Sequence, residues 1–126
     1  MQRLGQHFLT NTTIAKRIVD AAGILQTDMV LEVGPGTGML TQFLVTKAKK
    51  VVAVEKDRNL AVLLHEKFKN NRNLNVLEGD ILKIFNFQFF CQRRLPVRQA
   101  GIRLGRTIFK QFPKKYKIVA NIPYYI

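Results

Sequence analysis

The residues best suited to chemistry form a glycine-rich loop in the first third of the chain. It reads E-V-G-P-G-T-G over 32–38, after an apolar run at 29–31 and before a helix-like run at 39–44. Glycines let a backbone pass close to a ligand, and a helix that follows offers unpaired N–H groups to an anion. A strand, a glycine loop and a helix in this order indicate a nucleotide-binding turn, although such turns also occur as plain loops.

An acidic residue follows at the spacing of a ribose-binding carboxylate. Glu55 ends a second apolar run, 51–54, and lies about 20 residues after Gly34, as in nucleotide-binding folds. A carboxylate accepts two hydrogen bonds, and a vicinal diol donates two. The alternative is a solvated glutamate at the end of a strand, followed by a helix cap at Asp57. With the loop upstream, we favour the ribose-binding role.

The spacing of the glycines separates two classes of cofactor. Dinucleotide sites carry G-x-G-x-x-G, whereas here the third glycine, Gly38, arrives one residue earlier and Glu32 stands two residues before Gly34. This E-x-G-x-G-x-G pattern is similar to motif I of the class I S-adenosylmethionine-dependent methyltransferases. The resemblance favours S-adenosylmethionine as cofactor and makes a nicotinamide dinucleotide the weaker alternative.

The elements around these residues predict an α/β fold. We expect strands at 29–33, 51–55, 74–78 and 117–121, and helices at 13–22, 38–47 and 58–69. Strands alternating with helices favour a parallel sheet with helices on both faces, in the Rossmann-like arrangement of class I methyltransferases. Ligands of such sheets bind at the carboxyl ends of the strands. The residues expected at those ends are Gly34, Glu55, Asp80 and Asn121.

Capping residues and apolar spacing predict how the helices are placed. Asn11 or Thr12 is expected to cap the first helix, which Gly23 ends, and Asp57 to cap the third. The residues expected on buried faces are Ile14, Ile18 and Ala22 in the first helix and Leu60, Leu63, Leu64 and Phe68 in the third.

Length and composition fit one domain of a soluble protein. The chain has 126 residues, 47% of them hydrophobic, without a membrane-length apolar stretch or the apolar core of a signal peptide. Its single cysteine, Cys91, excludes an internal disulfide and a cysteine-based metal site. We therefore expect a protein of a reducing compartment, taken as the cytoplasm, with no metal and no membrane partner.

The charge is strongly basic and unevenly distributed. Lys and Arg number 21 against 8 Asp and Glu, a net charge of +13, which indicates a nucleic-acid partner over a merely solvated basic face. No acidic residue follows Asp80. The segment 83–116 combines phenylalanines with basic residues, so it is either a largely buried segment, which we favour for most of its aromatics, or a surface that binds single-stranded nucleic acid.

A last motif, N-I-P-Y at 121–124, brings the pattern to one family. With G-Q-H-F-L at 5–9, the glycine loop, Val54-Glu55 and E-G-D at 78–80, the chain resembles the ribosomal RNA adenine N6-dimethyltransferases. The resemblance runs from Gly5 to Tyr124. The proline in the glycine loop is similar to the small-subunit branch, which we favour over the large-subunit branch that confers macrolide resistance.

The resemblance implies a role for each matching residue. His7 and Leu9 would line the methionine end of S-adenosylmethionine, and Gly34 with Gly36 would contact it through the backbone. Glu55 would bind the ribose hydroxyls, and Asp80 would accept from the adenine amine of the cofactor. Asn121 would lie between cofactor and substrate. Asn121 and Pro123 would accept the two N6 hydrogens of the target adenine, which would hold N6 in line with the methyl group. Tyr124 would stack on the target base.

The same resemblance implies an incomplete chain. Residues 1–10 match a leader, and the C-terminal part of the sheet and the C-terminal helical domain are absent. The spacer from Asp80 to Asn121 is some twenty residues longer than in the family, so 83–116 is a basic insertion, either an RNA-binding segment or a disordered loop. We expect a full-length monomer acting on ribosomal RNA or a small-subunit precursor, and marginal stability for the fragment. Two alternatives remain: a basic RNA- or DNA-binding relative without turnover, and a small-molecule N-methyltransferase, which would not need the +13 charge.

Overall fold

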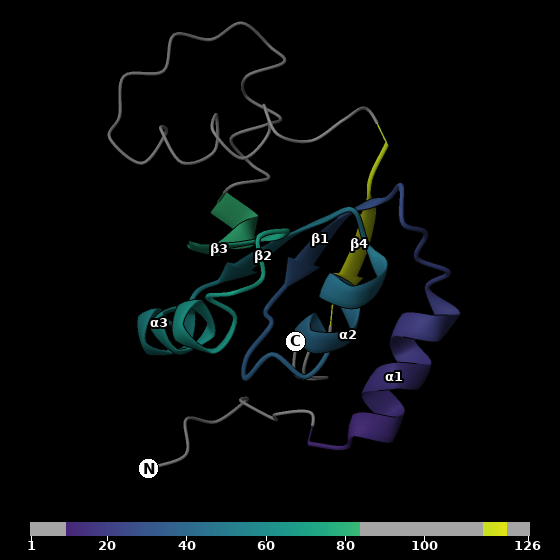
Figure 1. Ribbon diagram of the computed structural model, residues 1–126. Helices are drawn as coiled ribbons and strands as arrows, with labels where there is room; N and C mark the ends of the chain where they lie inside the picture. The colour runs from purple at the N-terminus through teal and green to yellow at the C-terminus, as the bar shows by residue number, and fades with distance from the viewer. Residues whose placement is uncertain (1–9, 84–114, 121–126) are drawn as a thin grey trace, which may run out of the picture.

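Helices and strands alternate along residues 10–83 and 115–120, the part of the chain that the computed structural model describes. Figure 1 shows this order along the chain. The elements are α1 (Thr12–Ala21), β1 (Met29–Val33), α2 (Thr41–Lys47), β2 (Lys50–Glu55), α3 (Arg58–Lys67), β3 (Leu74–Glu78) and β4 (Lys117–Ala120). The predicted alternation of strands and helices is confirmed.

The four strands form one parallel sheet in the order β3-β2-β1-β4. In the middle, Val33 pairs with Val54 of β2 and with Ala120 of β4, while Glu55 pairs with Glu78 of β3. The strands therefore end at the same edge of the sheet. This is the edge at which the sequence placed the candidate site, and the α/β fold with a parallel sheet is confirmed.

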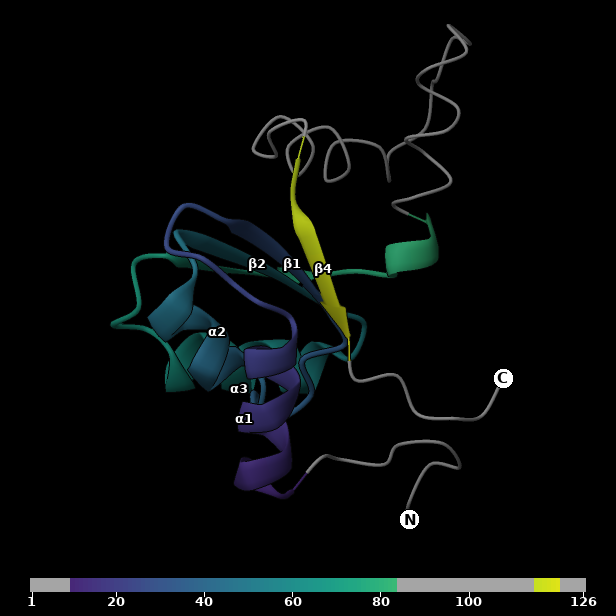
Figure 2. The same ribbon diagram turned by 90° about the vertical axis from the view of Figure 1, so that its right-hand side faces the viewer.

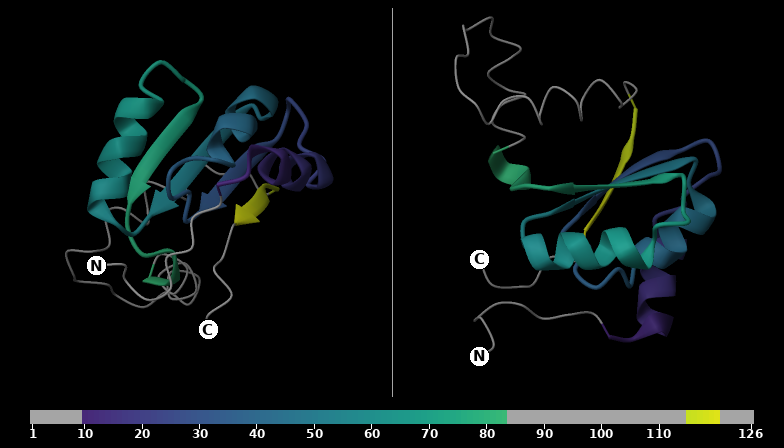
Figure 3. Two further views of the ribbon diagram at one scale, coloured as in Figure 1. Left: turned by 90° about the horizontal axis from the view of Figure 1, so that it is seen from below. Right: turned by 60° about the vertical axis from the view of Figure 1, so that its left-hand side comes forward.

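Helices α1, α2 and α3 cover one face of this sheet. Figure 2 and the right-hand view of Figure 3 show them on the same side of the strands. The chain steps from β1 to β2 to β3 in one direction along the sheet, and right-handed crossovers in one direction place their helices on one face. On the other face, the described residues place a short helical turn at 81–83, whose Ile81 packs against Leu31, Val52 and Val54. Residues 84–114, between β3 and β4, lie outside the described part of the chain.

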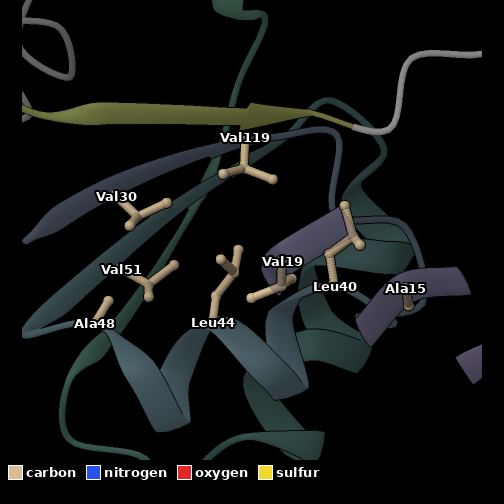
Figure 4. Packing of buried hydrophobic residues seen from close by; sticks show 8 residues of the cluster. All are labelled: Ala15, Val19, Val30, Leu40, Leu44, Ala48, Val51 and Val119. Carbon is tan, nitrogen blue, oxygen red and sulfur yellow. The ribbon is translucent and has the colours of Figure 1, made fainter. Parts of the chain in front are cut away.

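The main core lies between α1, α2 and the sheet. Figure 4 shows Leu44 of α2 pointing toward the strand residues Val30, Val51 and Val119. The buried residues of this cluster are Ala15, Val19, Val30, Leu40, Leu44, Ala48, Val51 and Val119. Full burial of each larger aliphatic side chain contributes about 1.5–3 kcal/mol, so this cluster holds the helices against the strands that carry the site.

The predicted caps are confirmed in detail. The Asn11 carboxamide oxygen accepts from the backbone N–H groups of Thr13 and Ile14, and the Asp57 carboxylate accepts from those of Asn59 and Leu60. Gly23, with φ +58°, ends α1 by donating to the Asp20 carbonyl at 3.1 Å. Helices α1 and α3 therefore have fixed amino-terminal ends, whereas α2, which follows the glycine loop, has no side-chain cap.

Two predicted helix faces are partly wrong. Ile14 and Leu63 are 45% and 47% exposed, while Ala15 and Ala61 occupy the buried positions beside them. The buried rows are Ala15 with Val19 in α1 and Ala61 with Leu64 and Phe68 in α3. Alanine lets a helix approach the sheet closely, so the contact surface is centred on the small residue and the larger neighbours turn outward.

Helix α2 begins later than predicted. The sequence indicated a start at residue 38, but residues 36–40 form turns and the helix begins at Thr41. Gly38 has φ +87°, a left-handed conformation that an α-helix of L residues does not contain. The glycine loop is thus longer than the pattern indicated, and the predicted N–H groups of a helix do not directly follow Gly38.

Candidate cofactor site

The glycine loop crosses the carboxyl edge of the sheet between β1 and β2. The Gly34 N–H donates to the Val54 carbonyl at 3.0 Å, which ties the first residue of the loop to the end of β2. Gly34 has φ +65°, and a β-carbon built there would meet nothing within 4 Å. The backbone of the loop at Gly34 therefore faces open space, as a ligand that contacts the main chain requires.

Gly38, the third glycine of the loop, is required for packing rather than for an open backbone. A β-carbon at Gly38 would lie 2.6 Å from Cε2 of Phe68 and 3.0 Å from Cδ2 of Leu64. Both side chains belong to the buried face of α3. Gly38 is required because helix α3 packs directly against the loop, so this position supports the site without facing it.

Glu55 is held at the centre of the edge by two backbone donors. Its Oε2 accepts from the Gly36 N–H at 3.0 Å and its Oε1 accepts from the Asp57 N–H at 2.9 Å. The residue is 7% exposed. Each carboxylate oxygen can accept a second hydrogen bond, so Glu55 is oriented by the loop and still able to accept from two hydroxyl groups. This geometry suits the ribose role that the sequence predicted.

Asp80 lies next to Glu55 at the same edge. The Gly79 N–H donates to the Glu55 carbonyl at 2.9 Å, so the chain leaves β3 directly beside the end of β2. The Asp80 Oδ1 accepts from the Leu82 N–H at 3.0 Å, and Oδ2 lies 3.6 Å from Nζ of the exposed Lys56. Gly34, Glu55 and Asp80 are therefore brought together as predicted.

The remaining predicted site residues lie outside the described part of the chain. His7 and Leu9 belong to 1–9, and Asn121, Pro123 and Tyr124 belong to 121–126. The nearest described residue to the N-I-P-Y motif is Ala120, which pairs with Val33 beside the start of the glycine loop. Strand β4 therefore ends next to the loop.

A second carboxyl group lies beneath the loop and its state was not predicted. Glu32 is 1% exposed, and its Oε2 accepts from the Thr41 hydroxyl at 2.7 Å, while Oε1 is buried without a hydrogen-bond partner in the described structure. Burial, with a smaller contribution from the Glu55 charge, raises the pKa of Glu32 to about 7. The sequence marked Glu32 as part of the motif, but burial on both sides of a central strand depends on tertiary packing.

These carboxyl groups suit the chemistry of S-adenosylmethionine. This cofactor carries a sulfonium and an ammonium group, which carboxylates attract, and a ribose diol for Glu55. The residues present therefore fit S-adenosylmethionine. Within 10–83 and 115–120, no cluster of three or more His, Cys, Asp or Glu side chains could hold a metal ion. None of the helices there combines the length and apolar character that a membrane crossing needs.

Comparison with known proteins finds ribosomal RNA methyltransferases among the similar proteins. The chain is 40% identical over 98% of its length to a ribosomal RNA small subunit methyltransferase A of Alkaliphilus metalliredigens, of which it covers 37%. Its structure is similar to a dimethyladenosine transferase from Plasmodium falciparum, with a TM-score of 0.63 and 32% identity over 94% of this chain and 34% of that one. It is also similar to the 23S rRNA methyltransferase ErmE, with a TM-score of 0.58 and 37% identity over 60% of this chain and 31% of that one.

The chain therefore spans little more than a third of the curated relatives it matches. The match itself is continuous, since the model of the family described as ribosomal RNA adenine dimethylase covers residues 1–126. The parallel sheet, the glycine loop and the carboxylates at its edge are the structural counterparts of that match. On this evidence the chain belongs to the ribosomal RNA adenine dimethylase family.

Proposed function

We propose that this chain carries the cofactor-binding part of an enzyme that transfers methyl groups from S-adenosylmethionine to N6 of adenosines in ribosomal RNA, giving N6,N6-dimethyladenosine. The observation that carries the proposal is the placement of Glu55. Its carboxylate is fixed by the Gly36 and Asp57 N–H groups, beside Asp80 and under an open glycine loop. Membership of the family supplies the reaction to which such a site belongs.

The described residues would bind and orient the cofactor. Glu55 accepts from the ribose hydroxyls through the lone pairs that the loop leaves free, and Asp80 accepts from the adenine amine. The backbone of Gly34 and Gly36 would contact the methionine part. Bound S-adenosylmethionine supplies a methyl group already activated on a sulfonium, so the protein has mainly to position the acceptor.

Residues outside the described part complete the proposal. His7 and Leu9 line the methionine end. Asn121 and Pro123 provide acceptors for the two N6 hydrogens, which directs the nitrogen lone pair at the methyl group and stabilises the charge that develops there. Tyr124 stacks on the target base, which leaves its helical stack to reach the site. No strong general base is needed, since the proton leaves a nitrogen that becomes acidic as the bond forms.

The proposed substrate is small-subunit ribosomal RNA or its precursor particle. The net charge of +13 suits a polyanion, and the curated relative named above is, by its name, a methyltransferase of small-subunit ribosomal RNA. The similarity to ErmE keeps large-subunit RNA as the alternative. We further propose a cytoplasmic location and a monomer in the full-length protein.

A relative that binds nucleic acid without turnover is the second candidate. The observation that favours it is the net charge of +13, which suits a polyanion whether or not a methyl group is transferred. A small-molecule N-methyltransferase is disfavoured by the basic charge. Methyl transfer to naked small-subunit RNA, naked large-subunit RNA and a small primary amine, measured side by side, separates all these possibilities.

The first test is calorimetric titration of the chain with S-adenosylmethionine. Glu55→Ala should weaken binding about 100-fold or more, because each hydrogen bond to a charged acceptor contributes about 1.5–3 kcal/mol. Glu78→Ala is the matched control, since Glu78 pairs with Glu55 across the strands and is exposed. Circular dichroism shows whether each variant is folded. Equal affinity of the two folded variants would contradict the ribose assignment.

A further inference from the structure

Glu32 is the buried ionisable group that the proposed chemistry does not use. It lies in the central strand β1, between Ala53 of β2 and Val119 of β4. Its Oε2 accepts from the Thr41 hydroxyl of α2, whereas its Oε1 is buried and unpaired in the described structure. An ionised carboxylate is unfavourable in a buried position when one oxygen accepts from a single neutral donor and the other oxygen accepts no hydrogen bond.

The charges on the neighbouring elements do not compensate Glu32. The nearby charge on β2 is that of Glu55, which is also acidic and raises the pKa of Glu32 further. The lysines on the packed elements lie elsewhere: Lys50 and Lys117 stand opposite Met29 and Val30 at the other end of the sheet. Lys117 pairs with Asp28, and Lys47 of α2 pairs with Asp20. A proton is therefore the most accessible compensating charge for the Glu32 carboxylate.

A cationic ligand would change this balance. The loop that begins two residues after Glu32 has open space over Gly34, and it is connected to Glu55 through the Gly36 N–H. A ligand bound there with a sulfonium and an ammonium group places positive charge near both carboxyl groups. In a site from which water is excluded, that charge favours the ionised carboxylate.

We infer that Glu32 is protonated in the cofactor-free chain and releases its proton to solvent when S-adenosylmethionine binds, so that cofactor capture is coupled to deprotonation. The inference rests on the proposed function for the identity of the ligand. It makes Glu32 a positioning residue, joined to the start of α2 through the Thr41 hydroxyl, that adds attraction for the cofactor only once it has ionised. The alternative is that Glu32 stays protonated when the cofactor binds and serves only to link β1 to α2.

The coupling has a measurable size. With the pKa of Glu32 at about 7 in the free chain, affinity for the cofactor should be about tenfold weaker at pH 6 than at pH 8. Titrations at pH 6.5 in two buffers with different heats of ionisation should show release of most of one proton. Glu32→Gln, a neutral isostere that still accepts from Thr41, should release none through this position and should bind with weaker, pH-independent affinity.

Controls separate Glu32 from other groups. Glu66→Gln changes an exposed glutamate on α3 and should behave as the parent chain. Thr41→Val removes the one hydrogen bond that lowers the pKa of Glu32, so it should move the midpoint of the pH dependence to higher pH. The same proton release in Glu32→Gln as in the parent would assign it to another group, His7 foremost, and would overturn the inference.

Infrared difference spectroscopy tests the protonation without any assay of activity. At pH 6 the free parent chain should show a protonated-carboxyl band that Glu32→Gln lacks, and saturating S-adenosylmethionine should remove it. A missing band in the free chain, or a band unchanged by bound cofactor, would refute the coupling. A folded chain that binds no S-adenosylmethionine would contradict the proposed function, while the band in the free chain would still report the state of Glu32.

Discussion

Replacing Gly38 by alanine tests how the glycine loop is supported. The structure gives two separate costs for this substitution. Gly38 has φ +87°, and a β-carbon there would lie 2.6 Å from Cε2 and 3.0 Å from Cζ of Phe68. Phe68 is 8% exposed and packs within the α3 cluster, so its ring has little room to move aside. Alanine should therefore be strained in its backbone and overpacked in its side chain.

The two costs can be measured apart because the loop contains a matched glycine. At Gly34, φ is +65° and a β-carbon meets nothing within 4 Å, so Gly34→Ala carries the backbone cost alone, about 1–2 kcal/mol. Overpacking of a core adds about 1–3 kcal/mol. Gly38→Ala should then lower the free energy of unfolding by about 2–5 kcal/mol, and by clearly more than Gly34→Ala does.

Urea unfolding followed by circular dichroism measures both variants, and a double-mutant cycle with Phe68→Leu identifies the clash. In the Gly38→Ala background, Phe68→Leu should cost less than it does alone, because it removes the ring atoms that the new methyl group meets. Equal losses at Gly34 and Gly38, together with additive behaviour of the two changes in the cycle, would refute the view that α3 fixes the loop.

Three further predictions concern stability. Asp57→Ala should lower the free energy of unfolding by about 1 kcal/mol through loss of the α3 cap, whereas the exposed neighbour change Asn59→Ala should not, as thermal melts of the two variants will show. Because the folded pKa of Glu32 is raised from 4.5 to about 7, stability should decline by roughly 3 kcal/mol as pH rises through that window. Urea midpoints of Glu32→Gln against pH should lack that decline. Lys117 lowers the pKa of Asp28, so this pair adds stability above the usual aspartate range that is lost as pH falls, and Asp28→Asn should flatten the acid side of the same curve.

The sequence predicted the sheet well because the apolar runs are short and sharply bounded. Strand β1 at 29–33 and strand β3 at 74–78 have the predicted bounds. Polar or glycine residues stop each run, so each strand stands out in the sequence as a short apolar segment with clear ends. The order of the strands, and the face that the helices cover, depend on the direction in which the chain crosses from one strand to the next. That direction is known only once the strand pairings are known.

The buried faces of the helices were harder to predict, because a search for apolar spacing selects large apolar residues and passes over alanine. Leu63 was expected in the core, yet Ala61 is buried there and Leu63 is half exposed. The helix face that packs on the sheet is the one that lets the helix backbone come closest to the strands. This depends on the shape of the sheet surface, which the sequence of the helix alone does not reveal. The same limit applies to Glu32, whose unpaired oxygen results from neighbours on β2, β4 and α2.

The glycine motif combines positions with unlike physical reasons. Gly34 faces the open side of the loop, whereas Gly38 faces Phe68 of the α3 cluster. Helix α3 also reaches the loop through Lys67, whose Nζ donates to the Thr37 carbonyl at 2.9 Å and lies 5.4 Å from the Phe68 ring centroid. Helix α3 and the carboxylate of Glu55 therefore hold the loop from two sides in the absence of any ligand. A loop held in this way loses little conformational entropy on binding, so we expect residues of α3 to contribute to the proposed cofactor affinity without touching the cofactor.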